Sequence, residues 1–170
     1  MASSRTVIIA GAGIGGLTAA LAIARHGFDV TIFDQAQRLE EIGAGIQLSP
    51  NASHILIALG LGEQLRRHVV APEELRVMNA RTARVLARAP LGAIAEKRYG
   101  APYWVIHRGD LQAVLIDAVR AHPGIVLNLG ARVEDFALKE DGARSTTTRR
   151  RQSARRRDLR GDAARSARRP

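Results

Sequence analysis

The sequence predicts an α/β domain built on a parallel βαβ unit with inserted helices and a β-hairpin. Two observations near the N-terminus carry this prediction. Residues 7–10 (Val-Ile-Ile-Ala) are typical of a buried parallel strand, and the glycine-rich run 11–16 leads directly into an apolar helix over 17–24. A third observation is that large apolar residues almost disappear after Gly142. A segment of that composition buries too little surface to offset its ordering entropy, so we expect disorder over 143–170.

The glycine run has the spacing of a dinucleotide-binding turn. Gly11, Gly13 and Gly16 follow the pattern G-x-G-x-x-G between the strand and the helix. In such a turn the first glycine permits the tight bend, the second lets the backbone approach a pyrophosphate, and the third lets the helix pack close to the strand. The N-terminus of the helix adds N–H groups that favour phosphate. The pattern predicts a dinucleotide site, the alternative being a tightly packed βα turn without a ligand.

An acidic residue ends the second predicted strand. Residues 30–33 (Val-Thr-Ile-Phe) are typical of a buried strand, and Asp34 follows the glycines by about 20 residues. A carboxylate at this place accepts hydrogen bonds from ribose hydroxyls and repels a 2′-phosphate. We therefore expect FAD or NAD, between which the residues alone do not choose. Taken alone, Asp34 could also be an ordinary turn residue.

The middle of the chain is predicted to contain a loop, two helices and a hairpin. The loop follows the second strand and contains Gly43 and Gly45. A helix begins after Ser49, its expected N-cap, with Pro50 in the first position, and ends at Gly60. The remaining elements of this part are a short helix and two hairpin strands, over 62–69, 75–78 and 84–88.

The rest of the predicted domain returns to the α/β pattern. A short strand over 103–106 precedes a helix from Asp110, its expected cap, to Ala121, and two strands follow over 125–129 and 132–138. A plain Rossmann fold passes from its second strand through one crossover helix to its third. Here roughly 90 residues intervene, and an insertion of that length indicates function. We therefore expect an incomplete Rossmann-like domain over residues 1–142.

The net charge of +10 belongs to the C-terminal segment. Residues 1–142 carry 15 basic and 14 acidic side chains, whereas residues 143–170 carry 11 arginines and 2 aspartates. The body therefore gives no case for a basic nucleic-acid-binding surface. The chain has no cysteine, no apolar run of membrane-spanning length and no signal-peptide pattern at its start. We expect a cytoplasmic protein without disulfides, thiolate metal sites or membrane partners.

Three interpretations of residues 143–170 stay open. The arginines could form an arm for nucleic acid, although the absence of aromatic residues for base stacking argues against it. The segment could be a solvated linker to a partner. The abrupt change to Arg, Ala, Ser, Thr and Gly favours a third interpretation, an out-of-frame reading of a GC-rich gene. An intact reading frame in the natural transcript would contradict that hypothesis.

Two further blocks of sequence resemble a known family. The blocks are Glu41-Ile42-Gly43-Ala44-Gly45-Ile46-Gln47-Leu48-Ser49-Pro50-Asn51-Ala52 and His107-Arg108-Gly109-Asp110-Leu111. Together with the glycine run, they resemble the FAD-dependent aromatic hydroxylases, the class A flavoprotein monooxygenases, of the salicylate hydroxylase and 3-hydroxybenzoate 6-hydroxylase type. The resemblance covers residues 5 to about 142. It implies FAD as cofactor, NADH or NADPH as co-substrate, and hydroxylation of a small aromatic substrate with O2.

The resemblance also implies roles for individual residues. Those implied at the pyrophosphate and the adenosine ribose are Gly11, Gly13, Ile14, Gly16 and Asp34. Gly45, Ile46 and Gln47 would lie near the isoalloxazine ring. Arg108 would reach an FAD phosphate or ribose, and Gln112, one turn later on the same helix, would face the cofactor. For Arg108 the alternative is a surface salt bridge.

Part of the family pattern has no counterpart in this chain. The second FAD signature (Gly-Ala-Asp-Gly), a later Gly-Asp motif and the β-sheet substrate domain are all unmatched, apart from a faint likeness at residues 160–163. We therefore expect the N-terminal portion of a hydroxylase. The alternatives are a non-catalytic dinucleotide-binding remnant and an NAD-linked dehydrogenase. No catalytic residue is identified, and His54 and His107 are expected to be structural because no set of metal ligands is evident.

Overall fold

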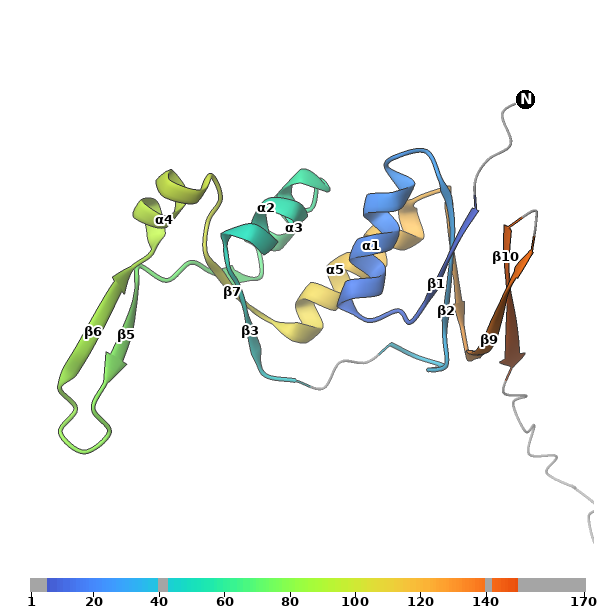
Figure 1. Ribbon diagram of the computed structural model, residues 1–170. Helices are drawn as coiled ribbons and strands as arrows, with labels where there is room; N and C mark the ends of the chain where they lie inside the picture. Colours follow the sequence, from blue (N-terminus) through green and yellow to red (C-terminus); the bar gives the residue numbers. More distant parts are fainter. Residues whose placement is uncertain (1–5, 40–42, 140–141, 150–170) are drawn as a thin grey trace, which may run out of the picture.

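Three parallel strands form the sheet predicted at the start of the chain. In the computed structural model, β1 (Thr6–Ala10), β2 (Asp29–Asp34) and β8 (Ile125–Leu129) pair in the order β1-β2-β8 (Figure 1). The structure describes residues 6–39, 43–139 and 142–149. The predicted parallel βαβ unit is confirmed, and the strand after the long insertion adds to it beside β2.

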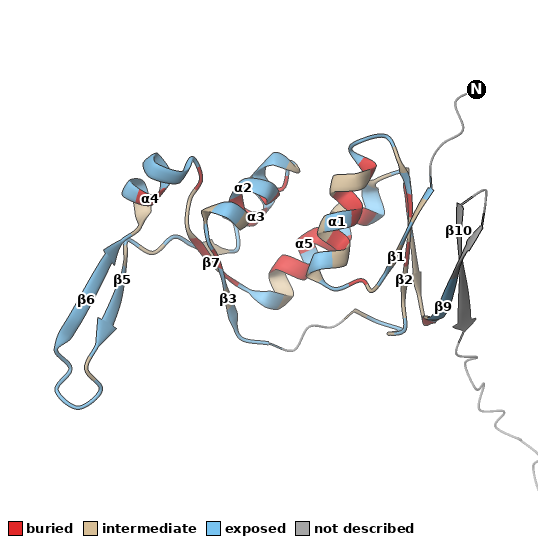
Figure 2. Ribbon diagram, viewed as in Figure 1, coloured by how far each residue is buried: buried red, intermediate tan, exposed pale blue. Residues whose placement is uncertain are grey.

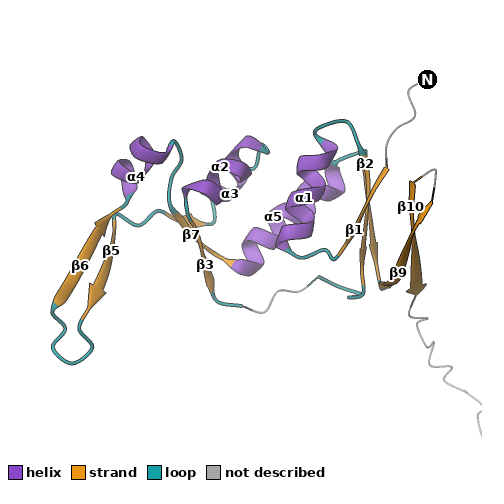
Figure 3. Cartoon of the chain, viewed as in Figure 1, coloured by secondary structure: helices purple, strands orange, loops and turns teal. Residues whose placement is uncertain are grey.

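Two helices cover one face of this sheet. α1 (Ile14–Ala24) and α5 (Arg108–Ala121) pack against each other and against the strands, with the helices on one side and a second strand pair on the other (Figures 1 and 3). The cross-strand row Ile9, Ile32 and Leu127 contributes to the core between the helices and the sheet. Apolar and β-branched side chains favour a strand that is buried on such a face.

The second strand pair corrects one expectation about the C-terminal segment. β9 (Ala131–Lys139) and β10 (Gly142–Arg149) form an antiparallel pair, whereas disorder was predicted from residue 143 onward. The expectation of disorder was based only on the small amount of apolar surface that this segment can bury. Backbone pairing with β9 supplies hydrogen bonds, and the threonine run 146–148 is β-branched, which favours a strand. Residues 150–170 lie outside the described residues.

A separate antiparallel sheet occupies the insertion. It contains β3 (Gly45–Leu48), β7 (Trp104–His107) and the short β4 (Val69–Val70), in the order β3-β7-β4. The sequence predicted a loop where β3 lies. Ile46 and Leu48 alternate with more exposed neighbours, but the strand is only four residues long and begins at a glycine, so its pattern is weak.

Three helices belong to the insertion. They are α2 (Pro50–Ala58), α3 (Gly62–Arg66) and α4 (Gly92–Tyr99). Of these, α2 packs against β3, while α3 and α4 pack against α2. Ser49 occupies the predicted N-cap position of α2, but its hydroxyl donates to Asn51 Oδ1 (2.5 Å) instead of capping the backbone. Gly60 ends the helix turn with φ +87° as predicted. The shorter α3 stops before the predicted Val69 because that residue pairs in β4.

A hairpin extends from this part of the molecule. β5 (Glu74–Met78) and β6 (Val85–Pro90) confirm the predicted hairpin, and Asn79 donates its N–H to Arg84 O (2.8 Å) at the turn. Nearly all of its residues are exposed, in contrast to the buried residues along α1, α5 and β2 (Figure 2). The core therefore lies between the helices and the sheets β1-β2-β8 and β3-β7-β4, away from the hairpin.

Candidate functional site

The first glycine makes the turn that joins β1 to α1. Gly11 has φ +105°, a backbone conformation that other residues rarely adopt, and its N–H donates to Phe33 O at 2.7 Å. The hydrogen bond ties the turn to the end of β2. The predicted role of Gly11 as the residue that permits the bend therefore has a geometric basis.

The other two glycines differ in what surrounds them. A Cβ placed on Gly16 would lie 2.0 Å from Gly11 O, so only glycine lets α1 begin this close to the turn. A Cβ placed on Gly13 would meet nothing within 4 Å. The fold itself does not require a glycine at position 13. The bare, exposed backbone there leaves room for a ligand at the N-terminus of α1, where helical N–H groups lack partners within the helix.

Asp34 holds the glycine turn and the chain that follows β2. Its Oδ2 accepts the N–H of Ala12 and its Oδ1 accepts the N–H of Ala36, both at 2.7 Å. Each carboxylate oxygen can accept a second hydrogen bond. Asp34 is half-buried, so it shapes the turn and still offers acceptor capacity to a hydroxyl group.

A pocket of about 210 Å³ opens beside Asp34. Its lining combines the turn with the start of β9: Ala10, Gly11, Phe33, Asp34, Gln35, Ala131, Arg132 and Val133. The sequence did not identify residues 131–133 as site residues. The signal was available in principle, because a parallel neighbour of β2 ends at the same edge of the sheet and the next residues must lie near Asp34.

The remaining predicted residues gather where β3 meets α5. A Cβ on Gly43 would lie 3.3 Å from Arg108 Cδ, so the Arg108 side chain passes beside the backbone of Gly43. Arg108 and Gln47 are exposed, Ile46 is half-buried, and Gln112 is buried with 4% of its surface exposed. Of the quoted block, Glu41 and Ile42 lie outside the described residues.

Tyr103 joins this group although the sequence did not single it out. Its hydroxyl donates to Gln47 Oε1 at 2.7 Å. The two residues are far apart in sequence and meet because β3 and β7 pair with Leu48 opposite Trp104. The sequence predicts a loop where β3 lies, so it predicts no pairing between β3 and β7. The contact between Tyr103 and Gln47 depends on that pairing.

The start of α5 corrects the predicted cap. The helix begins at Arg108 instead of after Asp110, and its N-cap is His107, whose Nδ1 accepts the N–H of Gly109 at 3.2 Å. Asp110 lies in the first turn, where an acidic side chain is favoured by the helix dipole. His107 therefore has a structural role, as predicted. The side chain of Arg108 leaves the helix at its first position, where N–H groups also attract anions.

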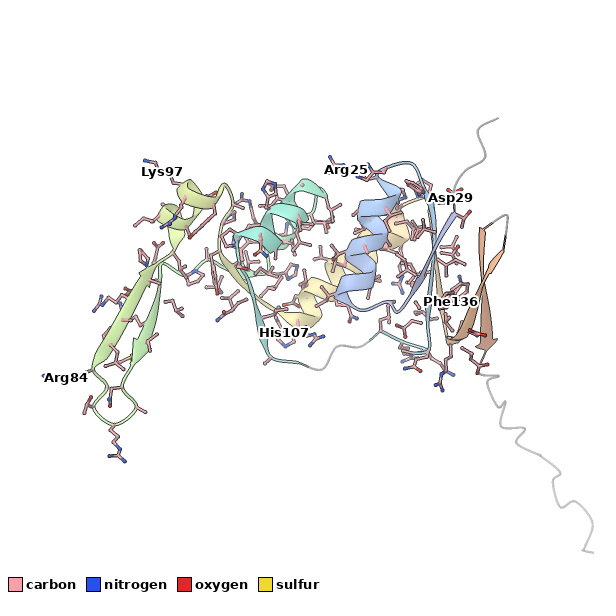
Figure 4. The ribbon with its side chains drawn as sticks, in the orientation of Figure 1. Arg25, Asp29, Arg84, Lys97, His107 and Phe136 are labelled. Carbon is pink, nitrogen blue, oxygen red and sulfur yellow. The ribbon has the colours of Figure 1, made fainter. Side chains whose placement is uncertain are left out.

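The two groups of residues lie along one edge of the molecule. The N-termini of α1 and α5 point to the same end, and His107 marks the start of α5 there (Figures 1 and 4). The pocket at Asp34 lies on the β2 side of the α1 N-terminus, and β3 with Arg108 lies on the other side. An elongated ligand with an anionic centre suits this order.

Other kinds of site find little support in the described part of the chain. Residues 6–39, 43–139 and 142–149 contain no cluster of three or more side chains suited to a metal ion. Within the same ranges no helix is both long and apolar enough to cross a membrane. Hydrogen bonding and charge from Arg76, with the charge of Arg88, lower the pKa of Glu74, but this group lies on the exposed hairpin.

Known proteins resemble the chain in sequence. The profile of a family described as FAD binding domain matches residues 4–162. The chain is 46% identical over 114 residues to a 3-hydroxybenzoate 6-hydroxylase of Polaromonas naphthalenivorans (strain CJ2), covering 67% of this chain and 28% of the relative. It is 37% identical over 138 residues to a 6-hydroxynicotinate 3-monooxygenase of Pseudomonas fluorescens, covering 79% of this chain and 35% of the relative.

A solved structure has the same fold. The flavin-dependent monooxygenase PieE, in complex with FAD and substrate, matches with a TM-score of 0.70 and 21% identity, covering 85% of this chain and 27% of that chain. The chain spans about a third of the length of the curated relatives it matches. The resemblance to FAD-dependent aromatic hydroxylases is confirmed by these relatives and by the profile match. The chain belongs to the FAD binding domain family.

Proposed function

We propose that the chain binds FAD and provides the FAD-binding part of an NAD(P)H-dependent monooxygenase that hydroxylates a small phenolic or aromatic substrate. The observation that carries the proposal is the glycine turn, whose backbone is bare at Gly13 and whose shape is held by Asp34. Membership of the FAD binding domain family supports the choice of FAD. The relatives named 3-hydroxybenzoate 6-hydroxylase and 6-hydroxynicotinate 3-monooxygenase support the reaction class.

The residues at the turn fit the adenosine half of FAD. We assign the pyrophosphate to Gly11, Gly13, Ile14 and Gly16, because the N–H groups at the start of α1 lie beside open space. The unused acceptor capacity of Asp34 suits the ribose hydroxyls, and its negative charge disfavours a 2′-phosphate. The pocket that reaches residues 131–133 offers a place for the adenine ring.

The residues around β3 fit the flavin half. Gly45, Ile46 and Gln47 lie on the strand next to the start of α5, and Arg108 supplies a positive charge that can meet a phosphate or ribose oxygen. Gln112 is buried one turn after Arg108, so in this assignment it supports the site from within the helix. These residues bind and orient; we assign no proton transfer to them.

FAD held by these residues would supply the redox chemistry of hydroxylation, with NADH or NADPH as co-substrate and O2 as the source of the added oxygen. The contribution of this chain is to hold the dinucleotide extended across the α1 and α5 N-termini. We place this activity in the cytoplasm, with no membrane partner. We assign no role in nucleic-acid binding, since the charge of residues 1–142 is nearly balanced.

Equilibrium titration with FAD, ADP and NADH tests the proposal and its main alternative. We expect FAD to bind at least tenfold more tightly than NADH, because only FAD carries the isoalloxazine ring that we assign to Gly45 and Gln47. Tenfold corresponds to about 1.4 kcal/mol. Flavin fluorescence and calorimetry are the measurements. NADH binding as tight as FAD would instead support an NAD-linked dehydrogenase. Failure of all three ligands to bind would support a non-binding remnant.

A further inference from the structure

One face of the β3–β7 sheet is open and presents an organised polar pair. The register places Gln47 opposite Val105 and Gly45 opposite His107. In an antiparallel pair these residues share one face, while Ile46, Leu48 and Trp104 take the other. The second face is the buried one, since Leu48 and Trp104 are 4% and 2% exposed. The Gln47 face is therefore the one available to a ligand.

The hydrogen bond from Tyr103 sets the direction of the Gln47 amide. A phenolic O–H donates to Gln47 Oε1 (2.7 Å), so the carbonyl side of the amide faces the tyrosine. The amide Nε2 then turns away from Tyr103 with two N–H donors. A group at this position can bind an acceptor oxygen of a ligand, and it enters the complex already oriented.

Gly45 leaves the surface beside Gln47 flat. A Cβ at this position would make only ordinary contacts, 3.7 Å from Val105 Cγ1 and 3.8 Å from Ile106 O. Packing of the protein therefore does not require glycine here. What the missing side chain does provide is a lower surface beside Val105, on the face that Gln47 and Val105 share. A flat, partly apolar surface with one oriented donor suits a planar aromatic ligand.

We propose that Tyr103 is a positioning residue that orients Gln47 to donate from Nε2 to an acceptor oxygen on a planar aromatic ligand. The inference rests on the proposed function and deepens it. Two sources can supply that oxygen: a carbonyl of the flavin ring or the carboxylate of an aromatic substrate. Both are hydrogen-bond acceptor oxygens carried by an aromatic ring system. Binding measurements with separate ligands distinguish the two sources.

The test measures FAD, ADP and 3-hydroxybenzoate binding to the 170-residue chain and to two variants. Tyr103→Phe frees the Gln47 amide. Gln47→Glu keeps an acceptor for Tyr103 but removes the N–H donors. If the flavin ring is the source, both variants weaken FAD about fivefold while ADP, which lacks the ring, binds unchanged. If the substrate is the source, the ratio of the FAD and ADP affinities stays the same in both variants. In that case, 3-hydroxybenzoate perturbs the absorbance of the bound flavin in the variants only at a concentration about fivefold higher than in the wild type.

The controls separate positioning from a general structural effect. Tyr99→Phe removes a hydroxyl from a tyrosine elsewhere on the surface and should change none of the three affinities. Adding Tyr103→Phe to a Gln47→Leu variant should cause no further loss, since the tyrosine acts through Gln47. Unchanged binding of all ligands in both single variants overturns the inference alone. Failure of the wild-type chain to bind both FAD and ADP overturns the proposed function and this inference with it.

Discussion

At the scale of single residues, the three glycines of the turn perform separable tasks. Gly16 is required by packing, because a side chain there would collide with Gly11 O. Gly11 is required by its backbone conformation, with φ +105°. Gly13 is required by neither, and the proposed function explains it by the close approach of a ligand. On that proposal, the motif G-x-G-x-x-G combines two requirements of the fold with one requirement of the ligand.

Gly16→Ala tests the packing demand. A Cβ placed 2.0 Å from a backbone oxygen forces the turn and α1 apart. We expect the variant to lose about 3 kcal/mol of unfolding free energy, at the upper end for an overpacked site. Urea denaturation followed by circular dichroism measures it. A loss below about 1 kcal/mol would show that α1 shifts freely, and the close packing would then not be essential.

Gly13→Ala tests the ligand demand, with Gly15→Ala as the matched control. Neither new methyl group meets protein atoms within 4 Å, so both variants should fold as the wild type does. We expect FAD affinity to fall at least tenfold, about 1.4 kcal/mol, in Gly13→Ala only. Titration by flavin fluorescence checks this. Equal affinity in the two variants would remove Gly13 from the proposed pyrophosphate site.

At the scale of elements, one buried hydroxyl connects α2 to the chain entering β7. Ser53 is fully buried, and its Oγ donates to Pro102 O at 2.5 Å. Ser53→Ala leaves that carbonyl without this partner, and we expect a loss of about 1–2 kcal/mol in unfolding free energy. Ser49→Ala is the control: its exposed hydroxyl caps no backbone group, so the change should stay within about 0.5 kcal/mol. Chemical denaturation of both variants compares them, and equal losses would contradict the assignment.

The elements that the sequence predicted are those with a strong local pattern. β1, α1, β2, the β5–β6 hairpin and α5 each carry an apolar period or a turn signal. α4 was missed because only Ala95 is buried along it, so no apolar stripe marks it. β3 was missed because it is short and begins at a glycine, and β10 because its stability comes from pairing with β9.

The residues of the candidate site also divide into those that a local sequence pattern predicts and those that it does not. The glycine turn, Asp34 and Arg108 were predicted because each is defined within a few residues of chain. Tyr103 and residues 131–133 were not, since their place depends on which distant strands pair and in which register. Those pairings join segments that are distant in sequence, so the pattern within any one segment is not enough to predict them.

At the scale of the whole molecule, the proposed dinucleotide site lies at a sheet in which β1 has a neighbouring strand on one side. Within the described ranges β1 pairs only with β2, and Ile8 and Val126 remain 37% and 55% exposed on the sheet. A ligand that joins the turn, Asp34 and the start of α5 would add further contacts between these elements. The folded chain should therefore depend on its ligand for part of its stability.

FAD added at 100 times its dissociation constant should raise the unfolding free energy by about 2.7 kcal/mol. The increase follows from binding to the folded chain alone, and it should appear as a higher midpoint in urea denaturation. Gly13→Ala at the same FAD concentration should show a much smaller increase. A wild-type midpoint that does not respond to FAD would contradict binding by the folded chain.

The two hydrogen bonds of Asp34 also bear on how this family could change its nucleotide. Exchanging the acid for a small neutral residue is the obvious way to admit a phosphorylated ribose. Here the same exchange would release the N–H groups of Ala12 and Ala36, both now bonded at 2.7 Å. Such an exchange would therefore loosen the turn that we propose as the dinucleotide site. An engineered or evolving variant would need a replacement anchor for the turn before it could gain a new preference.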